Sequence, residues 1–212
     1  QRSMGRAAID AGAGLVPYAL MLGVLCGLVM LQPDLGTTVV LALIGSLLLW
    51  ASAKVQVPFY PVPMTMQTLV VIGLGLALGP MRGAAAVALY FAQGAFGLPV
   101  FAGTPEKGIG LAYMTGPTGG YLAGYIPATL LAGWLARRGW DRNPFTAMAA
   151  ALLAGAVIYV PGLLWLGAVI GWEKPVLAFG LYPFIPADIA KAMLAAIAFP
   201  AAWKRLSAKG VN

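Results

Sequence analysis

Long apolar runs, separated by short stretches that hold most of the charged residues, dominate the sequence. A helix needs about 20 apolar residues to cross the hydrocarbon core of a bilayer. Seven runs approach that length: 15–31, 35–53, 66–81, 83–101, 119–136, 146–171 and 188–203. Because only helices satisfy their backbone hydrogen bonds in lipid at such lengths, the pattern predicts an all-α, multi-pass membrane protein.

The composition supports the same class of protein. Of the 212 residues, 61% are hydrophobic and 9% are charged, whereas about 25% of residues are charged in an ordinary soluble domain. The sequence has no histidine and one cysteine, Cys26, which excludes histidine-based catalysis, histidine-ligated metals and an intrachain disulfide. Six acidic residues occur in total. We therefore expect neither an enzyme nor a metal site.

The basic residues are distributed unevenly among the connections between the apolar runs. One set of connections carries Arg82, Arg137, Arg138, Arg142, Lys204, Arg205 and Lys209. The alternate set carries Lys54, Lys107 and Lys174. Since Lys and Arg accumulate in cytoplasmic loops, the first set predicts a cytoplasmic C-terminus and longer loops on the outer side. Membrane orientation thus accounts for the net charge of +7, and we expect no nucleic-acid partner.

The first apolar run does not fit this orientation. Residues 15–31 include Pro17, and a true span there would place Arg2 and Arg6 on the outer side. The preference of basic residues for the cytoplasm disfavours that arrangement. We therefore expect 15–31 to be an extra hydrophobic segment that lies on the membrane surface or is re-entrant.

The connection between the second and third runs, residues 54–67, contains three prolines that exclude a helix. The segment is therefore expected to be extended. Phe59 and Tyr60 supply aromatic surface, and Thr65 and Gln67 supply hydrogen-bonding groups beside the next helix. Two interpretations remain open: a rigid connector with a helix cap at Thr65, or one wall of a ligand pocket.

A second outer connection, residues 97–121, is too long and too apolar for a free hydrophilic loop. Connections of this length that are ordered are usually functional. Residues 116–120 read Gly-Pro-Thr-Gly-Gly and lead into a helix N-terminus, where free N–H groups favour an anion or a carbonyl oxygen. The alternative is a tight turn required only for packing.

An acid and a base stand at the start of the last apolar run. Asp188 and Lys191 are three residues apart, so a helix places them on one face. A charged pair at the rim of an apolar bundle is costly, which favours a functional role. The alternative is a capping acid with a lysine that partners it structurally.

The two loops and the charged pair together predict an outward-facing pocket with aromatic and apolar walls and a few polar groups. A carboxylate can accept two N–H bonds, and a lysine can donate to a carbonyl or a carboxylate. Such a pocket suits a small, mostly apolar ligand with a urea-like or amide-like end and an acidic end.

Four stretches of the sequence are specific when they are taken together. They are Val57-Pro-Phe-Tyr-Pro-Val-Pro-Met-Thr-Met-Gln67, Tyr90-Phe-Ala-Gln-Gly-Ala-Phe-Gly-Leu-Pro-Val-Phe101, Gly116-Pro-Thr-Gly-Gly-Tyr121, and Pro183-Phe184 followed by Asp188 and Lys191. In this order and spacing, residues 52–203 resemble the BioY family, the biotin-binding S components of energy-coupling factor (ECF) transporters.

The resemblance implies a six-helix S component in the bacterial cytoplasmic membrane that binds biotin from outside and uses no cofactor. It divides the chain into an atypical N-terminal hydrophobic segment, 1–34, and a substrate-binding transmembrane domain, 35–212. It also implies three partner chains, a transmembrane coupling subunit and two ATPase subunits, since this sequence holds no P-loop. Docking to them is expected through small residues before Lys54, here Ala42 and Ser46.

The resemblance further implies which residues bind biotin. Asp188 is expected to accept from the ureido N–H groups, with Lys191 at the ureido carbonyl or holding the acid. The remaining candidates are Gln67 and Gln93 as polar groups, Lys107 and the turn Gly116, Thr118, Gly119 and Gly120 for the carboxylate, and Phe59, Tyr60, Phe101 and Tyr113 for the rings. Which end of biotin meets which group is left open.

A second resemblance concerns residues 18–44. The stretch Gln32-Pro-Asp-Leu-Gly36 is similar to the SEDS (FtsW/RodA) family of cell-wall polymerases, although the rest of that fold is absent. The alternatives to biotin uptake are therefore an S component for another vitamin, a membrane protein with a SEDS-like role such as glycosyl transfer, and a packing protein without a ligand.

Overall fold

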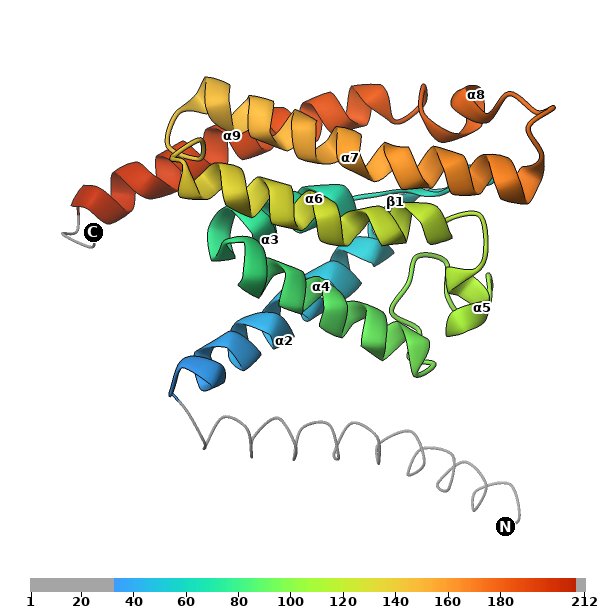
Figure 1. Cartoon of the computed structure of the whole chain (residues 1–212), viewed down its shortest axis with the longest axis horizontal. Helices are drawn as coiled ribbons and strands as arrows, with labels where there is room; N and C mark the ends of the chain where they lie inside the picture. The colour runs from blue at the N-terminus through green and yellow to red at the C-terminus, as the bar shows by residue number, and fades with distance from the viewer. Residues whose placement is uncertain (1–32, 209–212) are drawn as a thin grey trace, which may run out of the picture. The chain divides into compact units, whose positions relative to one another are not determined.

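The computed structural model describes residues 33–208 (Figure 1), and it is helical in this part apart from a short hairpin and loops. The helices are α2 (Pro33–Lys54), α3 (Gln67–Leu78), α4 (Pro80–Ala95), α5 (Leu111–Met114), α6 (Gly119–Arg137), α7 (Pro144–Ile170), α8 (Val176–Gly180) and α9 (Ile185–Ala208). The strands β1 (Gln56–Val57) and β2 (Met64–Thr65) pair antiparallel, with Gln56 opposite Thr65.

The predicted all-α membrane class is confirmed. Three segments of the described chain are long and apolar enough to cross a membrane, namely Leu35–Lys54, Pro144–Ile170 and Val176–Ala208, and α3 is a shorter apolar helix. Residues from Ala42 onward form one compact unit, separate from the residues before it. The run 15–31 lies outside the described residues, so the expected division at residue 34 stays a prediction.

The boundary between the third and fourth helices differs from the one expected at Arg82. Helix α3 ends at Leu78, and α4 begins two residues later at Pro80. Gly79 has a positive φ of 79°, which glycine adopts without strain. Pro80 then fits the first position of a helix, where the missing N–H costs nothing. The chain reverses here because of Gly-Pro rather than because of the arginine.

The fourth helix is also shorter than the apolar run predicts. It ends at Ala95 instead of continuing to residue 101, and Gly97 follows with a φ of 90°. Pro99 excludes further helix after that turn. Apolarity alone could not locate this end, because Phe101 is fully buried by loop packing rather than by a helix.

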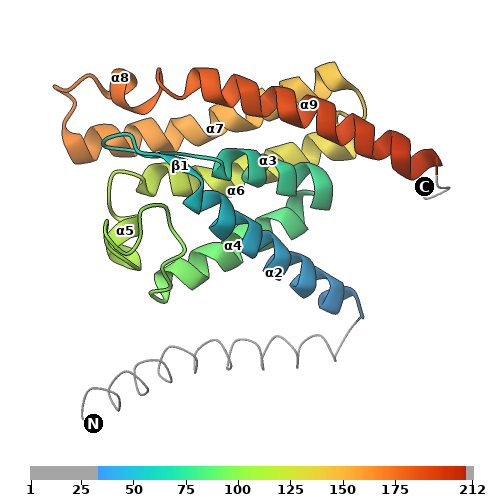
Figure 2. The same ribbon diagram turned by 180° about the vertical axis from the view of Figure 1, so that it is seen from behind.

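Helix α6 packs against three others. It contacts α7, α3 and α4, and α7 in turn contacts α9. Figures 1 and 2 show α7 and α9 running side by side, with α6 next to α7. Small residues permit these close approaches: a Cβ added at Gly124 would lie 2.8 Å from Ile158 Cα, and one at Gly75 would lie 2.5 Å from Thr129 O.

The small residues of α2 face inward. Ala42 is 7% exposed and Ser46 is fully buried. Between them, a Cβ added at Gly45 would lie 2.6 Å from Ala86 Cβ of α4. The expectation that Ala42 and Ser46 form the docking surface for a coupling subunit is therefore wrong, because the pattern of small residues serves packing within the chain.

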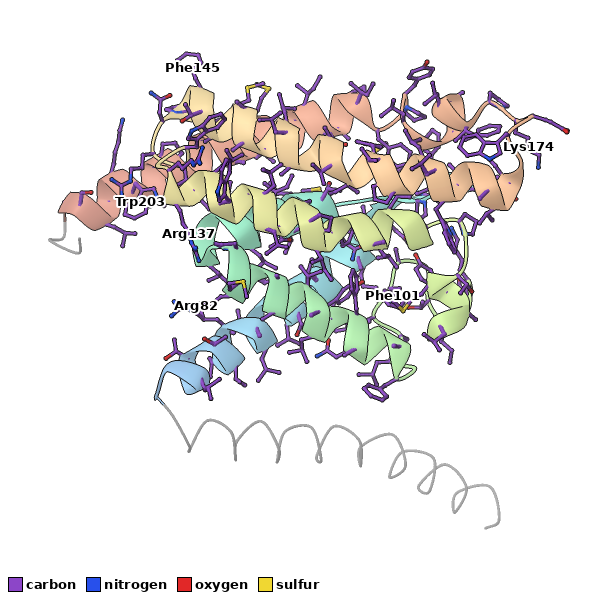
Figure 3. All side chains as sticks on the ribbon, in the orientation of Figure 1. Arg82, Phe101, Arg137, Phe145, Lys174 and Trp203 are labelled. Carbon is purple, nitrogen blue, oxygen red and sulfur yellow. The ribbon has the colours of Figure 1, made fainter. Side chains whose placement is uncertain are left out.

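The two sets of basic residues lie at opposite ends of the compact unit. Figure 3 shows Arg82, Arg137 and Trp203 at one end and Lys174 at the other. This follows from the helix bounds, because α4 begins where α6 and α9 end. We refer to the end with Arg82, Arg137, Arg138, Arg142, Lys204 and Arg205 as the basic end.

Candidate functional site

The charged pair at the start of α9 is joined to two other helices. Lys191 Nζ lies 3.1 Å from Asp188 Oδ1 and 2.7 Å from Thr68 Oγ1, which belongs to α3. The Tyr159 hydroxyl of α7 donates to the other carboxylate oxygen, Asp188 Oδ2. Together these four residues form one hydrogen-bonded network, which we call the Asp188 network.

The Asp188 network is mostly removed from solvent. Lys191 is 7% exposed, and the Asp188 side chain retains 19% of its surface. Asp188 stands in the first turn of α9, where an acid interacts favourably with the helix dipole. Burial of a charge is costly unless it is paired and hydrogen-bonded. Both charges meet that condition here.

A pocket with an empty volume of about 570 Å³, its open mouth included, lies beside the network. Small-molecule sites typically measure about 300–1,000 Å³. All four residues of the network line it. The other lining residues are Val62, Pro63, Thr65, Gln67, Ala102, Tyr113, Thr118, Tyr121, Leu122, Tyr125, Gly155, Ile158 and Phe184. The pocket thus combines a charged side with tyrosine-rich and apolar walls.

Gln67 is a buried polar residue of this pocket, at 3% exposure. Its Nε2 donates to Tyr90 OH at 2.8 Å, and Tyr90 OH donates to Val100 O at 3.1 Å. Its Oε1 lies 3.3 Å from Thr65 Oγ1, which donates to it. Gln67 therefore ties the β2 segment to α4 and to the loop after α4, while its side chain borders the pocket.

Tyr113 forms part of the pocket wall, and Phe101 supports it from behind. The two rings stack with centroids 4.9 Å apart, and Phe101 meets Tyr90 edge-on at 5.4 Å. Gly94 leaves room for Phe101, since a Cβ there would lie 2.0 Å from its Cζ. Burial raises the pKa of Tyr113 above its ordinary value, so its hydroxyl stays neutral at physiological pH.

The proline-rich segment places its two aromatic residues differently. The Phe59 ring lies 6.3 Å from the ring of Phe184, which lines the pocket, so Phe59 covers the pocket rim from outside. Tyr60 is 87% exposed and does not line the pocket. Val62, Pro63 and the following residues form the wall that the sequence assigned to this segment.

The turn at 116–120 is packed against α7. Gly116 O accepts from Trp165 Nε1 at 2.9 Å, and a Cβ at Gly120 would lie 2.3 Å from Pro161 O. A Cβ at Gly119 would lie 2.0 Å from Met114 O. Of the turn residues, Thr118 lines the pocket. The glycines are thus placed where packing requires them, which was the alternative left open.

Two further candidates lie away from the Asp188 network. Gln93 Nε2 donates to Ser46 Oγ at 3.3 Å, and Lys107 is exposed on the loop after α4. Lys54, which was counted only for orientation, holds that loop instead. Its ammonium lies 2.9 Å from Pro99 O and 3.2 Å from Phe101 O.

Several pocket residues were not identified from the sequence. They are Thr68, Tyr121, Tyr125, Ile158 and Tyr159. Tyr121 and Tyr125 are four residues apart on α6, and such spacing puts them on one face. Tyr159 was a polar tip within an apolar run, a signal that could have been followed. Its partner Asp188 is far away in the sequence.

The described residues show no arrangement suited to metal binding, since no three Asp, Glu, Cys or His side chains gather among residues 33–208. The Asp188 carboxylate is bonded to a tyrosine, a threonine and a lysine instead. The site can therefore accept and donate hydrogen bonds to a polar group within an otherwise apolar pocket.

Comparison with known proteins bears on this pocket. The model of the BioY family matches residues 18–208. A probable biotin transporter BioY of Pyrococcus horikoshii is 40% identical over 145 residues, covering 68% of this chain and 83% of the relative. The biotin transporter BioY of Thermotoga maritima is 36% identical over 151 residues, covering 71% of this chain and 86% of the relative.

The fold is also similar to a solved structure. The crystal structure of the S-component for biotin from an ECF-type ABC transporter matches with a TM-score of 0.69 at 25% identity. The match covers 82% of this chain and 94% of that one. The expected six-helix architecture is therefore that of a known S component.

The second resemblance is not supported. The BioY match begins at residue 18 and includes the whole stretch 18–44 that was compared with the SEDS family. From Pro33 onward this stretch belongs to one continuous helix, α2. A short motif such as Gln-Pro-Asp-Leu-Gly inside an apolar helix is too common to indicate a second family.

Proposed function

Because this chain belongs to the BioY family, we propose that it binds biotin in the pocket beside the Asp188 network and takes it up across the cytoplasmic membrane. In this role it is the substrate-specific S component of an ECF-type transporter. The names of the relatives and the similar solved structure support this proposal. The observation that carries it is the buried Asp188–Lys191 pair, which supplies an acceptor and a donor within an apolar pocket.

The chemistry of the ureido ring matches this pair. The ring offers two N–H donors and one carbonyl acceptor. A carboxylate has about four acceptor positions, and Asp188 uses three of them for Lys191, Thr68 and Tyr159. A ligand N–H can take the free position on Oδ2, and Lys191 can turn a donor toward the carbonyl.

The rest of biotin is largely apolar, as is the rest of the pocket. Tyr113, Tyr121, Tyr125 and Phe184 present ring faces and edges to the space beside the network. Contacts of this kind contribute through burial of apolar area and do not require charged partners. Thr118 is the polar group that the turn contributes there, and the carboxylate of the valerate chain remains to be assigned by experiment.

The wider assembly is part of the same proposal. BioY is a transporter family rather than an enzyme family, so we infer binding and transport without catalysis or a cofactor. A transmembrane coupling subunit and two ATPase subunits would supply the energy. We infer that the basic end faces the cytoplasm, which places the C-terminus there and opens the pocket outward.

Equilibrium binding of labelled biotin to the detergent-purified protein tests the proposal. We expect tight binding that weakens about 100-fold or more in Asp188→Asn and in Lys191→Met, since each leaves a desolvated group unmatched. Glu173→Gln and Lys174→Met are matched controls, because both residues are exposed outside the pocket. Failure of the folded wild type to bind biotin, with binding of another vitamin, would refute the proposal.

A further inference from the structure

A second hollow lies on the surface of α6 and α7, toward the basic end. It is a groove lined on α6 by Trp134 and Arg138, on α7 by Leu153 and Val160, and between them by Trp140. Its described lining residues differ from those of the biotin pocket. The groove is therefore a separate feature, and its argument does not depend on the biotin proposal.

The walls of this groove are apolar and open to the surroundings. Trp134 is 45% exposed, Leu153 is 49% exposed and Val160 is 63% exposed. Helix α7 is one of the segments long and apolar enough to cross a membrane. The groove thus follows a membrane-crossing helix, and the hydrocarbon of the bilayer is what contacts its length.

One end of the groove carries a positive charge in a defined position. The Arg138 guanidinium carbon lies 3.6 Å from the centroid of the Trp134 ring, so the ring holds the guanidinium beside the groove. A guanidinium lying flat on a ring keeps its edge N–H donors available. These donors match the oxygens of a phosphate in a bidentate geometry.

No acid of the described chain, residues 33–208, neutralises this guanidinium. The ion pair found there joins Asp188 and Lys191, far from the groove. Asp141 is the acid nearest in sequence, but it is 3% exposed and accepts from Trp203 Nε1. Arg137 precedes Arg138 and is exposed as well, which adds to the positive potential at this position.

We propose that this groove binds one anionic phospholipid. Its phosphate rests on Arg138, and one acyl chain follows the apolar wall of α6 and α7 past Leu153 toward Val160. Trp134 and Trp140 then lie at headgroup depth, where tryptophan is enriched in membrane proteins. The charge complementarity selects an anionic lipid over a zwitterionic one, as basic pockets between transmembrane helices do.

Native mass spectrometry of the purified chain tests the proposal, with phosphatidylglycerol and phosphatidylcholine titrated separately. We expect the first phosphatidylglycerol to bind more tightly than phosphatidylcholine. In Arg138→Gln its affinity should fall about fivefold, as expected for loss of one cation beside an anionic headgroup. Trp134→Leu, which keeps the charge but removes its platform, should also weaken binding.

Arg82→Gln is the matched control, because Arg82 is an exposed arginine at the same end that does not line the groove. Its lipid affinity should equal that of the wild type. Equal binding of both lipids by the wild type, or equal losses in Arg82→Gln and Arg138→Gln, would overturn the proposal. A dimer abolished by Arg138→Gln in the absence of any lipid would instead assign the groove to a second copy.

The unfolding midpoint of each variant is measured in lipid-free detergent beforehand. An unchanged midpoint in Arg138→Gln is expected, because its side chain is exposed. Should Arg138→Gln unfold, Trp134→Leu carries the comparison. Full retention of selective binding in that folded variant, against the expected loss, would count against the proposed site.

Discussion

The Tyr159 hydroxyl donates a hydrogen bond to Asp188 Oδ2, while the Lys191 ammonium bonds the other oxygen of the same carboxylate. Tyr159 comes from α7 and Asp188 from α9, so the bond joins two long helices beside the pocket. The orientation of the acid therefore depends on a helix other than its own.

Replacement of Tyr159 by phenylalanine should weaken biotin binding about tenfold. The ring and its packing are kept, but a hydrogen bond to a charged group, usually worth about 1.5–3 kcal/mol, is lost. Titration with labelled biotin measures the effect. Tyr182→Phe is the control, since that residue is 57% exposed and lies outside the pocket lining. Unchanged affinity in Tyr159→Phe would mean that Asp188 is held without this bond.

The Lys191→Met variant should unfold more readily than the wild type. Removing one partner of a buried ion pair leaves an uncompensated charge and typically costs about 3–5 kcal/mol. Adding Asp188→Asn removes that charge, so the double variant should recover part of the lost stability while biotin binding stays lost. Thermal unfolding in detergent, beside Lys174→Met, measures this. A double variant less stable than Lys191→Met would contradict the prediction.

Two glycine substitutions should have opposite effects on stability. In Gly124→Ala the new Cβ would lie 2.8 Å from Ile158 Cα and 2.9 Å from Ile158 O, so α6 and α7 must separate. Overpacking of this kind costs about 1–3 kcal/mol. In Gly155→Ala no atom lies within 4 Å of the new Cβ, and alanine favours the helix by about 0.8–1 kcal/mol.

Unfolding midpoints of the two variants in the same detergent provide the measurement. Gly124→Ala should unfold at a lower temperature than the wild type, and Gly155→Ala at the same or a higher temperature. Because Gly155 lines the pocket, biotin binding is not the readout for this pair. Equal destabilisation by both would show that close packing at Gly124 is relieved without cost.

Replacement of Lys54 by methionine should loosen the loop after α4. Its ammonium donates to Pro99 O, Phe101 O and Thr104, and Phe101 in turn supports Tyr113 in the pocket wall. Faster amide hydrogen exchange across residues 100–108 and a severalfold loss of biotin affinity are expected.

Lys107→Met provides the comparison, because Lys107 lies on the same loop with its side chain exposed. Amide exchange in this variant should match that of the wild type. If Lys107→Met alone lowered biotin affinity, the lysine would contact the ligand, as the family resemblance had suggested.

The pattern of apolar runs predicted the helices α2, α6, α7 and α9 to within a few residues, because burial in lipid demands long apolar segments. It was less accurate for α3 and α4. There, Gly79 and Pro80 set the chain reversal, and Gly97 and Pro99 end α4 within an apolar run. Local backbone conformation decided those ends, and hydrophobicity carries no information about it.

For the pocket, the sequence indicated the Asp188–Lys191 pair, Gln67, Tyr113 and Thr118, which the structure brings together. Charged or hydrogen-bonding groups are conspicuous beside apolar runs, and a helix places residues 188 and 191 on one face. Gln93, Lys107 and Tyr60 carried equally polar groups and lie elsewhere. Their residue types could not reveal which way each side chain faces.

The sequence by itself determined the class of protein, the separation of basic residues between two ends, and the pairing of Asp188 with Lys191. Each of these depends on composition or on spacing within one helix. Only the tertiary structure brought Tyr159 and Thr68 to Asp188, buried Ala42 and Ser46, and set Arg138 beside an apolar groove. Those relationships arise from packing between helices distant in the chain, where the contact geometry is decided by all the packed side chains at once.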